Sequence, residues 1–271
     1  MPRAGPIKEI KRVDGFELAK LGIVFIDPTH RPIFTGLRFQ CGHVHLKGVH
    51  KFMRNRMRNE SGQIRWVSKS RCIVVSSIKK SLGQSMQTSI NRYLSQFKPT
   101  DIGLMIERCF GLGVQASTET KRGSKVETFI EVVVERLRNK FDMSLIATNL
   151  PVADIDARVA TAVDLVFLSE KRIILVELKC GYSDAFRCKN TLFSIDDSIK
   201  VPDTHFTRFQ VQVALTKELF MKTYACEGYS VETMIFHLSR GVLRAYKEEP
   251  DCVDIATRML EIQRLPKVAK N

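Results

Sequence analysis

Two short apolar runs near the middle of the chain dominate its hydrophobic pattern. Val163–Leu168 and Ile173–Lys179 are rich in Val, Ile, Leu and Phe, which is typical of buried strands. If the Glu-Lys pair at 170–171 forms a two-residue loop, the runs pair as an antiparallel β-hairpin. Each run also carries charge toward the end that lies away from this loop.

The hairpin register brings these charged residues together inside a sheet. With Ser169 facing Arg172, Asp164 lies directly opposite Glu177, with Cβ atoms about 4.5–5.5 Å apart. Lys179 shares the face of Glu177 because side chains alternate along a strand. Opposed carboxylates repel each other and lose hydration, so a cation such as Mg²⁺ or Mn²⁺ between them is favoured. The alternative is an edge hairpin whose ion pair faces solvent.

The rest of the pattern predicts a mixture of helices and strands. Apolar residues at helical spacing predict helices over residues 15–21, 82–97, 102–109, 123–139, 203–224 and 251–262. Apolar runs predict strands over residues 22–26, 64–67, 72–76, 145–150, 231–238 and 242–246, with short strands or a hairpin within 31–49. Pro151 is expected to end the strand before it. Cys180–Val201 is expected to be a long loop, and such loops are usually functional.

Composition narrows the class of protein. The 271 residues are 44% hydrophobic and 27% charged, as in ordinary soluble globular proteins. No run of about 18 apolar residues predicts a membrane span, and the N-terminus lacks the apolar region of a secretory signal. The 7 cysteines have no regular spacing, which indicates reduced thiols in an intracellular protein.

The net charge of +14 is concentrated at one end of the chain. Residues 1–100 hold 19 Lys and Arg against 5 Asp and Glu, whereas residues 101–271 hold 24 of each sign. We therefore expect a basic nucleic-acid-binding region over 1–100 and a core over 101–271. The alternative is a targeting or solubilising segment. A dense basic run suggests phosphate contacts by Lys51, Arg54, Arg56 and Arg58.

The spacing of residues along the chain disfavours a zinc site and a nucleotide-binding loop. On one strand, Cys41 and His45 would lie about 13 Å apart, too far to share one zinc ion. Gly111 and Gly113 lack the remaining glycine of a GxGxxG loop, and no GxxxxGK[ST] segment exists, so ATP use has no support.

Three short motifs, taken in order along the chain, resemble the PD-(D/E)XK nuclease core. Arg122–Glu127 reads RGSKVE and is similar to the RGxxxE motif of a core helix. Asp164 followed by Glu177–Lys179 resembles the D…ExK motif, and Phe209–Gln212 resembles the QxQ pattern of the next helix. The resemblance covers about residues 111–238 and is strongest to the phage lambda exonuclease and herpesvirus alkaline nuclease group.

This resemblance implies an α/β (α+β) fold with a restriction-endonuclease-like core, in which helices flank a central mixed sheet. It also implies catalysis with Mg²⁺ or Mn²⁺. Asp164, Glu177 and the backbone carbonyl of Leu178 are the expected metal ligands. Glu127 is expected to complete the site directly or through water.

Lys179 and a glutamine are expected to complete the chemistry. Lys179 would orient or deprotonate the attacking water, and Gln210 would position that water or Lys179. Gln212 is expected to point elsewhere, because residues i and i+2 diverge on a helix. Further contacts to nucleic acid are expected from Lys121, Arg122, Lys125, Arg187 and Lys189.

The sequence therefore predicts a metal-dependent deoxyribonuclease, exonuclease-like by resemblance, in DNA recombination, repair or replication. A structure- or sequence-selective endonuclease acting on DNA or RNA is the alternative on the same core. A non-catalytic nucleic-acid-binding protein on a retired nuclease fold is a second. The resemblance also implies a single-strand-annealing partner and a homo-oligomer. Duplex or single-stranded DNA is the expected substrate, without membrane association, and the expected location is nuclear or nucleoid-associated.

Overall fold

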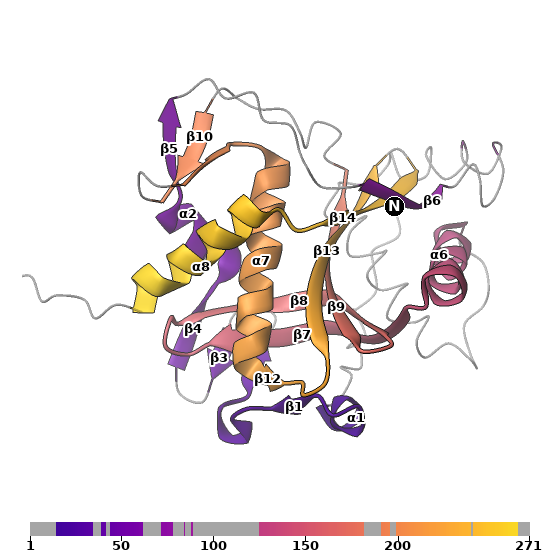
Figure 1. Cartoon of the computed structure of the whole chain (residues 1–271), viewed down its shortest axis with the longest axis horizontal. Helices are drawn as coiled ribbons and strands as arrows, with labels where there is room; N and C mark the ends of the chain where they lie inside the picture. The colour runs from indigo at the N-terminus through magenta and orange to yellow at the C-terminus, as the bar shows by residue number, and fades with distance from the viewer. Residues whose placement is uncertain are drawn as a thin grey trace, which may run out of the picture.

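A nine-stranded mixed sheet forms the centre of the protein, with helices on both of its faces (Figure 1). The computed structural model describes residues 15–34, 39–41, 44–61, 72–77, 84, 88, 125–181, 191–195, 199–239 and 241–264. This architecture confirms the predicted α/β class with a central mixed sheet flanked by helices.

The strands of the sheet come from both halves of the chain. In spatial order they are β2 (Pro32–Phe34), β3 (Phe39–Cys41), β4 (Val44–Gly48), β8 (Val159–Ser169), β9 (Arg172–Cys180), β13 (Ser230–Ser239), β14 (Val242–Lys247) and β6 (Cys72–Ser77), with β7 (Ser144–Asp154) beside β8. Pairs β8–β9 and β13–β14 are antiparallel, whereas β13 runs parallel to β9.

The central hairpin has the predicted register. Pairing runs from Ser169 opposite Arg172 to Leu165 opposite Val176, and the two residues between the strands form the turn. Glu170 takes the left-handed backbone conformation (φ 48°) that such a tight turn requires.

Alternating side chains of the hairpin pack into two separate hydrophobic cores, one on each face of the sheet. On one face, Ile174 and Val176 pack with α6 (Lys125–Phe141), which is the helix predicted over 123–139. On the other face, Ile173 and Leu175 pack in a larger core with α7 (His205–Thr223) and α8 (Pro250–Arg264). Helices α1 (Gly15–Lys20) and α2 (Val49–Arg56) add residues to this second core.

Two small sheets lie beside the main one. One pairs β1 (Val24–Phe25), which precedes the 3-10 turn η1 (Pro28–His30), with β12 (Tyr224–Ala225). The other joins β5 (Arg58–Ser61), β10 (Thr191–Ser194) and β11 (Lys200–Pro202). The prediction that residues 180–201 form a loop is therefore wrong in part, because β10 lies within that stretch and pairs with β11, which begins there.

The expectation that Pro151 ends its strand is also wrong. β7 continues to Asp154, and Pro151 lies opposite Ala162 in the ladder. β8 is the only described strand that pairs with β7, and an edge strand tolerates a residue without an N–H group.

Several predictions fall on residues outside the described part of the chain. These are the strand over 64–67 and the helices over 82–97 and 102–109, of which only Gln84 and Thr88 are described, both helical. The boundary placed near residue 100 lies there too, so the division into 1–100 and 101–271 stays a prediction. None of the described helices is long and apolar enough to cross a membrane.

Candidate active site

Asp164 lies on an edge of β8 that its neighbouring strands leave uncovered. β7 runs along one edge of β8 for its whole length, so β4 and β9 share the other edge. β4 pairs only with Val159 and Ala160, and pairing with β9 begins only at Leu165. Residues 161–164 thus face the place where these two strands separate.

The Asp164 carboxylate bridges this separation with its side chain. Asp164 Oδ2 accepts a hydrogen bond of 2.7 Å from the backbone N–H of Leu178 on β9. A side-chain oxygen therefore does here what a main-chain carbonyl does in a regular ladder. The predicted opposition of Asp164 and Glu177 continues the observed register, but main-chain pairing stops one residue short of it.

Near Asp164, both β8 and its neighbour β7 depart from regular β geometry. Val163 packs in the core beneath α7 and Leu165 in the core beneath α6, although alternate residues of a regular strand share one face. Across the ladder lies Asn149, between Thr148 and Leu150, with a left-handed backbone (φ 52°). Such irregularities re-aim side chains and are frequent beside active sites.

Glu177, Lys179 and Gln212 form hydrogen bonds with one another where α7 packs on β9. Lys179 Nζ lies 2.6 Å from Glu177 Oε1, and Gln212 Nε2 donates to the same oxygen over 2.6 Å. Lys179 Nζ also donates to Gln212 Oε1 over 3.1 Å and lies 5.0 Å from the centre of the Phe209 ring. The Glu177 and Lys179 side chains are 5% and 11% exposed, so this is a nearly buried, fully paired ion pair.

Of the two glutamines of α7, the structure places Gln212 at the candidate site, where the sequence predicted Gln210. Gln210 is buried and directed away from the carboxylates: its Nε2 donates to the carbonyl of Lys247, and its Oε1 accepts from the N–H of Glu249. Gln212 makes the contact expected of Gln210. The two side chains diverge as expected for i and i+2, but the helix is rotated so that Gln212 faces β9.

The carboxylates offer part of a site for a hard cation. The side-chain hydrogen bonds from Lys179 and Gln212 both end on Glu177 Oε1. Among the described residues, none donates a hydrogen bond to Glu177 Oε2. Oxygen atoms of Glu177, Asp164 and the Leu178 carbonyl suit Mg²⁺ or Mn²⁺ in kind. The described residues contain no group of three or more His, Cys, Asp or Glu side chains placed to hold a metal. Glu127 lies on α6, and its side chain is outside the described atoms.

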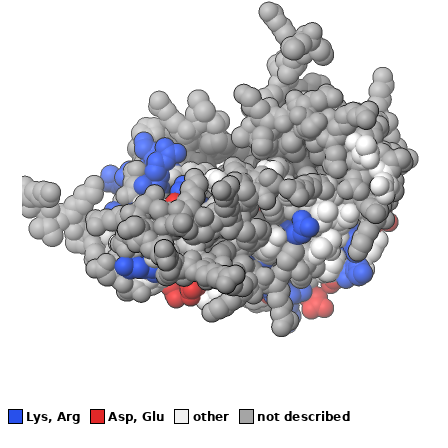
Figure 2. Space-filling model, turned by 90° about the horizontal axis from the view of Figure 1, so that it is seen from above, with Lys and Arg blue, Asp and Glu red and all other residues white. Residues whose placement is uncertain are grey.

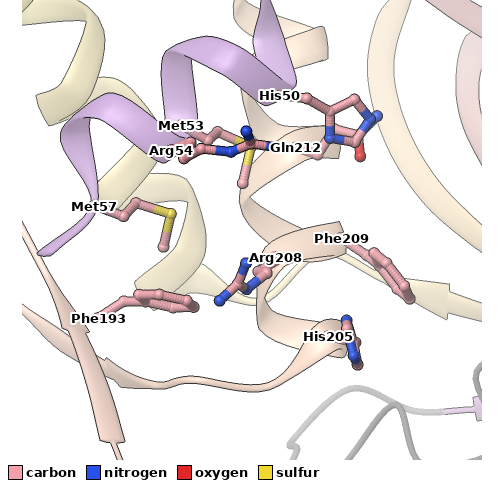
Figure 3. A pocket seen from close by; sticks show the side chains of 9 residues that line it. All are labelled: His50, Met53, Arg54, Met57, Phe193, His205, Arg208, Phe209 and Gln212. Atoms are coloured by element: carbon pink, nitrogen blue, oxygen red, sulfur yellow. The ribbon is translucent and has the colours of Figure 1, made fainter. Parts of the chain in front are cut away.

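A groove of about 680 Å³ opens beside this set, between α2, β10 and the first turns of α7 (Figure 3). Gln212 belongs both to its lining and to the hydrogen-bonded set with Glu177 and Lys179. His50 lies on its wall. Loss of water around the His50 ring lowers its pKa, nearby Lys179 lowers it further, and Glu177 opposes this.

The predicted nucleic-acid contacts divide into three groups. Lys51 and Arg54 are exposed on α2, and Arg54 lines the groove. Arg56 is instead half-buried and donates to Gln263 of α8. The side chains of the remaining predicted contacts lie outside the described atoms: Arg58, Lys121, Arg122, Lys125, Arg187 and Lys189. On the face seen in Figure 2, the largest visible group of Lys and Arg lies at the left, the side on which α2 and β10 lie in Figure 1, and smaller groups lie at the right.

Comparison with known proteins returns little. The chain matches no protein-family model and no curated protein. Among solved structures it is similar to a "Putative exonuclease" from Eubacterium rectale, at 15% identity and a TM-score of 0.37, over 69% of this chain and 76% of that one. A likeness this distant adds nothing to the geometry described above.

One signal in the sequence could have identified the residues that were missed. His205, Arg208, Phe209 and Gln212 recur at steps of three or four and therefore share one face of α7. That face contains the groove lining and the partner of Glu177. His50 carried no comparable signal, because its position depends on how β4 leads into α2.

Proposed function

We propose that this protein is a metal-dependent nuclease that hydrolyses phosphodiester bonds of DNA. The observation that carries the proposal is the Glu177–Lys179–Gln212 set, held on β9 and α7 beside the separation of strands at Asp164. A carboxylate pair, a lysine and an amide concentrated beside a basic groove are the groups that phosphodiester hydrolysis requires.

Each residue of the set has a distinct task in the proposed reaction. Lys179 orients the attacking water and stabilises negative charge that develops on the phosphate. Gln212 fixes the position of the Lys179 ammonium and of the Glu177 carboxylate. Phe209 limits the movement of Lys179 through its ring face.

Asp164, Glu177 and the carbonyl of Leu178 would hold a Mg²⁺ or Mn²⁺ ion, with Glu127 as a further ligand. Such an ion, when bound, lowers the pKa of water and neutralises phosphate charge. The hydrogen bond from the Leu178 N–H fixes Asp164 Oδ2 in this arrangement.

The finer assignment rests on the motif resemblance. An RGxxxE-like segment, the D…ExK pattern and the glutamine helix follow one another in the order of the PD-(D/E)XK core. We therefore favour an exonuclease that trims DNA in recombination, repair or replication. A homo-oligomer, a single-strand-annealing partner and a nuclear or nucleoid location belong to the same proposal.

The proposal is tested with linear duplex DNA labelled at the 5′ or the 3′ end, incubated with and without Mg²⁺. Mg²⁺-dependent loss of label is expected, and the end that releases its label first gives the polarity. Covalently closed circular DNA is the matched control and should stay intact. Rapid cutting of circles would exclude an obligate exonuclease, and no cutting of any substrate would refute the nuclease assignment.

A further inference from the structure

The groove beside Gln212 combines basic and apolar side chains in one place. The basic members are His50, Arg54, His205 and Arg208, and the apolar members are Met53, Met57, Phe193 and Phe209. None of its described lining residues is acidic. In Figure 3, Arg208 projects near the middle, with Phe193 and Met57 toward one end and Phe209 and His50 toward the other.

Arg208 is a fixed cation in this groove. Its Nε and Nη2 atoms donate to Asp203 Oδ1 over 3.3 and 3.0 Å, and its guanidinium lies 4.6 Å from the centre of the Phe193 ring. The Asp203 side chain is 7% exposed, whereas that of Arg208 is 48% exposed. The guanidinium is therefore positioned from behind by Asp203 and presented to solvent in front. Arginine held in this way suits an incoming phosphate.

The apolar walls add a second requirement for the ligand. In a duplex, the faces of the bases are covered by neighbouring base pairs and cannot reach aromatic or thioether side chains inside a groove. An unpaired base exposes its π-face and stacks on aromatic residues with little regard to sequence. The half-buried His205 lines the groove and stacks on the buried Phe209 ring, with ring centres 6.4 Å apart, so Phe209 supports the aromatic surface that His205 provides.

We propose that this groove holds one unpaired nucleotide of the substrate strand, next to the bond that is cut. The base lies against the half-buried His205 ring and Met57, while Arg54 and Arg208 bind its phosphate. The volume of about 680 Å³ falls in the range of about 300–1,000 Å³ that is usual for small-ligand sites. This inference rests on the proposed nuclease function, and it predicts that the substrate must be unpaired locally to reach Lys179.

The test measures binding by fluorescence anisotropy in EDTA, where no cleavage interferes. The probes are a blunt duplex, duplexes with a short 5′ or 3′ single-stranded extension, and the same extended duplexes with abasic sites in the extension. One extension should tighten binding about tenfold over the blunt duplex, and its abasic form should lose this gain. Equal binding of the normal and abasic forms would overturn the proposal.

Protein variants locate the effect in the groove. His205→Leu keeps an apolar side chain but removes the aromatic surface, so it should abolish the difference between normal and abasic extensions. Arg54→Gln, at an exposed position of α2, should weaken all extended probes equally. Arg258→Gln on α8 is the control, because Arg258 is 48% exposed, pairs with Glu261 and is not part of the groove lining. A base-dependent gain that survives His205→Leu would place the base elsewhere and overturn the proposal.

Failure of this inference differs from failure of the proposed function. A protein that cleaves DNA but is indifferent to abasic extensions retains the nuclease function and loses the nucleotide groove. A protein that binds extended duplexes through His205 but never cleaves them retains the groove and loses the nuclease function.

Discussion

The strongest contrast within the structure lies between two glutamines on one helix. Gln210 and Gln212 are both buried on α7, but Gln210 holds main-chain atoms at the junction of β14 and α8, whereas Gln212 holds Glu177 and Lys179. Replacing each in turn with methionine, which has a similar length and no amide, should separate stability from activity.

The expected magnitudes follow from what each substitution leaves behind. Gln210→Met removes one hydrogen-bond partner from the part-buried Lys247 carbonyl and one from the buried Glu249 N–H. At about 1–3 kcal/mol for the buried group and about 1 kcal/mol for the part-buried one, the free energy of unfolding should fall by about 2–4 kcal/mol. Gln212→Met leaves Glu177 and Lys179 paired at 2.6 Å, so its cost should be only about 1–2 kcal/mol.

The effects on kcat should have the reverse order: Gln212→Met should lower kcat more than Gln210→Met does. Gln212→Met releases Lys179 from one of its hydrogen-bonded neighbours, and kcat should fall about 10–100-fold, as when a supporting residue around a metal site is lost. Gln210→Met should keep the kcat of the wild type at a temperature where it is folded. Urea unfolding followed by circular dichroism gives the stabilities, and single-turnover cleavage gives the rates. A Gln210 variant that is stable but inactive would refute the assignment of roles.

Three further substitutions test other parts of the structure. Arg264→Leu leaves the buried Asp154 carboxylate without its guanidinium, and urea unfolding should show a loss of about 2–3 kcal/mol, reduced because Arg264 is partly exposed. Burial lowers the pKa of His237 and outweighs its hydrogen bond to Gly181. Its neutral form therefore stabilises the fold above about pH 6.5, and this stability is lost as the pH falls through the lowered pKa. His237→Gln should flatten the decline in unfolding free energy between about pH 7 and about pH 5; an unchanged decline would exclude His237 as its source. Glu170→Gly should raise the free energy of unfolding by about 1 kcal/mol, since φ is 48° there, and a loss would show that the Glu170 side chain itself stabilises the turn.

The central hairpin shows how far the sequence could predict this structure. Apolar runs on both sides of a two-residue turn leave only a few registers that bury both faces, and the observed one was predicted. The break in pairing at Asp164 could not be predicted, because it depends on β4, a strand more than one hundred residues earlier in the chain. Long-range pairing of this kind leaves no local pattern.

The site was predicted less completely than the sheet. Glu177 and Lys179 pair with each other on β9, and Asp164 of the neighbouring strand accepts a hydrogen bond from the N–H of Leu178, which lies between them in the sequence. The choice between Gln210 and Gln212 depends on the rotation of α7, which is set by packing against β13 and α8 as well as β9. The sequence contained both glutamines but gave no information on that rotation.

Single-turnover cleavage of an end-labelled duplex in Mg²⁺ by Lys179→Ala tests the central claim most directly. Lys171→Ala is the matched control, because Lys171 is exposed in the turn of the same hairpin. DNA affinity measured in EDTA shows whether each variant still binds its substrate. We predict that Lys179→Ala loses cleavage while its DNA affinity is largely retained, and that Lys171→Ala cleaves like the wild type. Cleavage by Lys179→Ala at the rate of the wild type would contradict the assignment of this site.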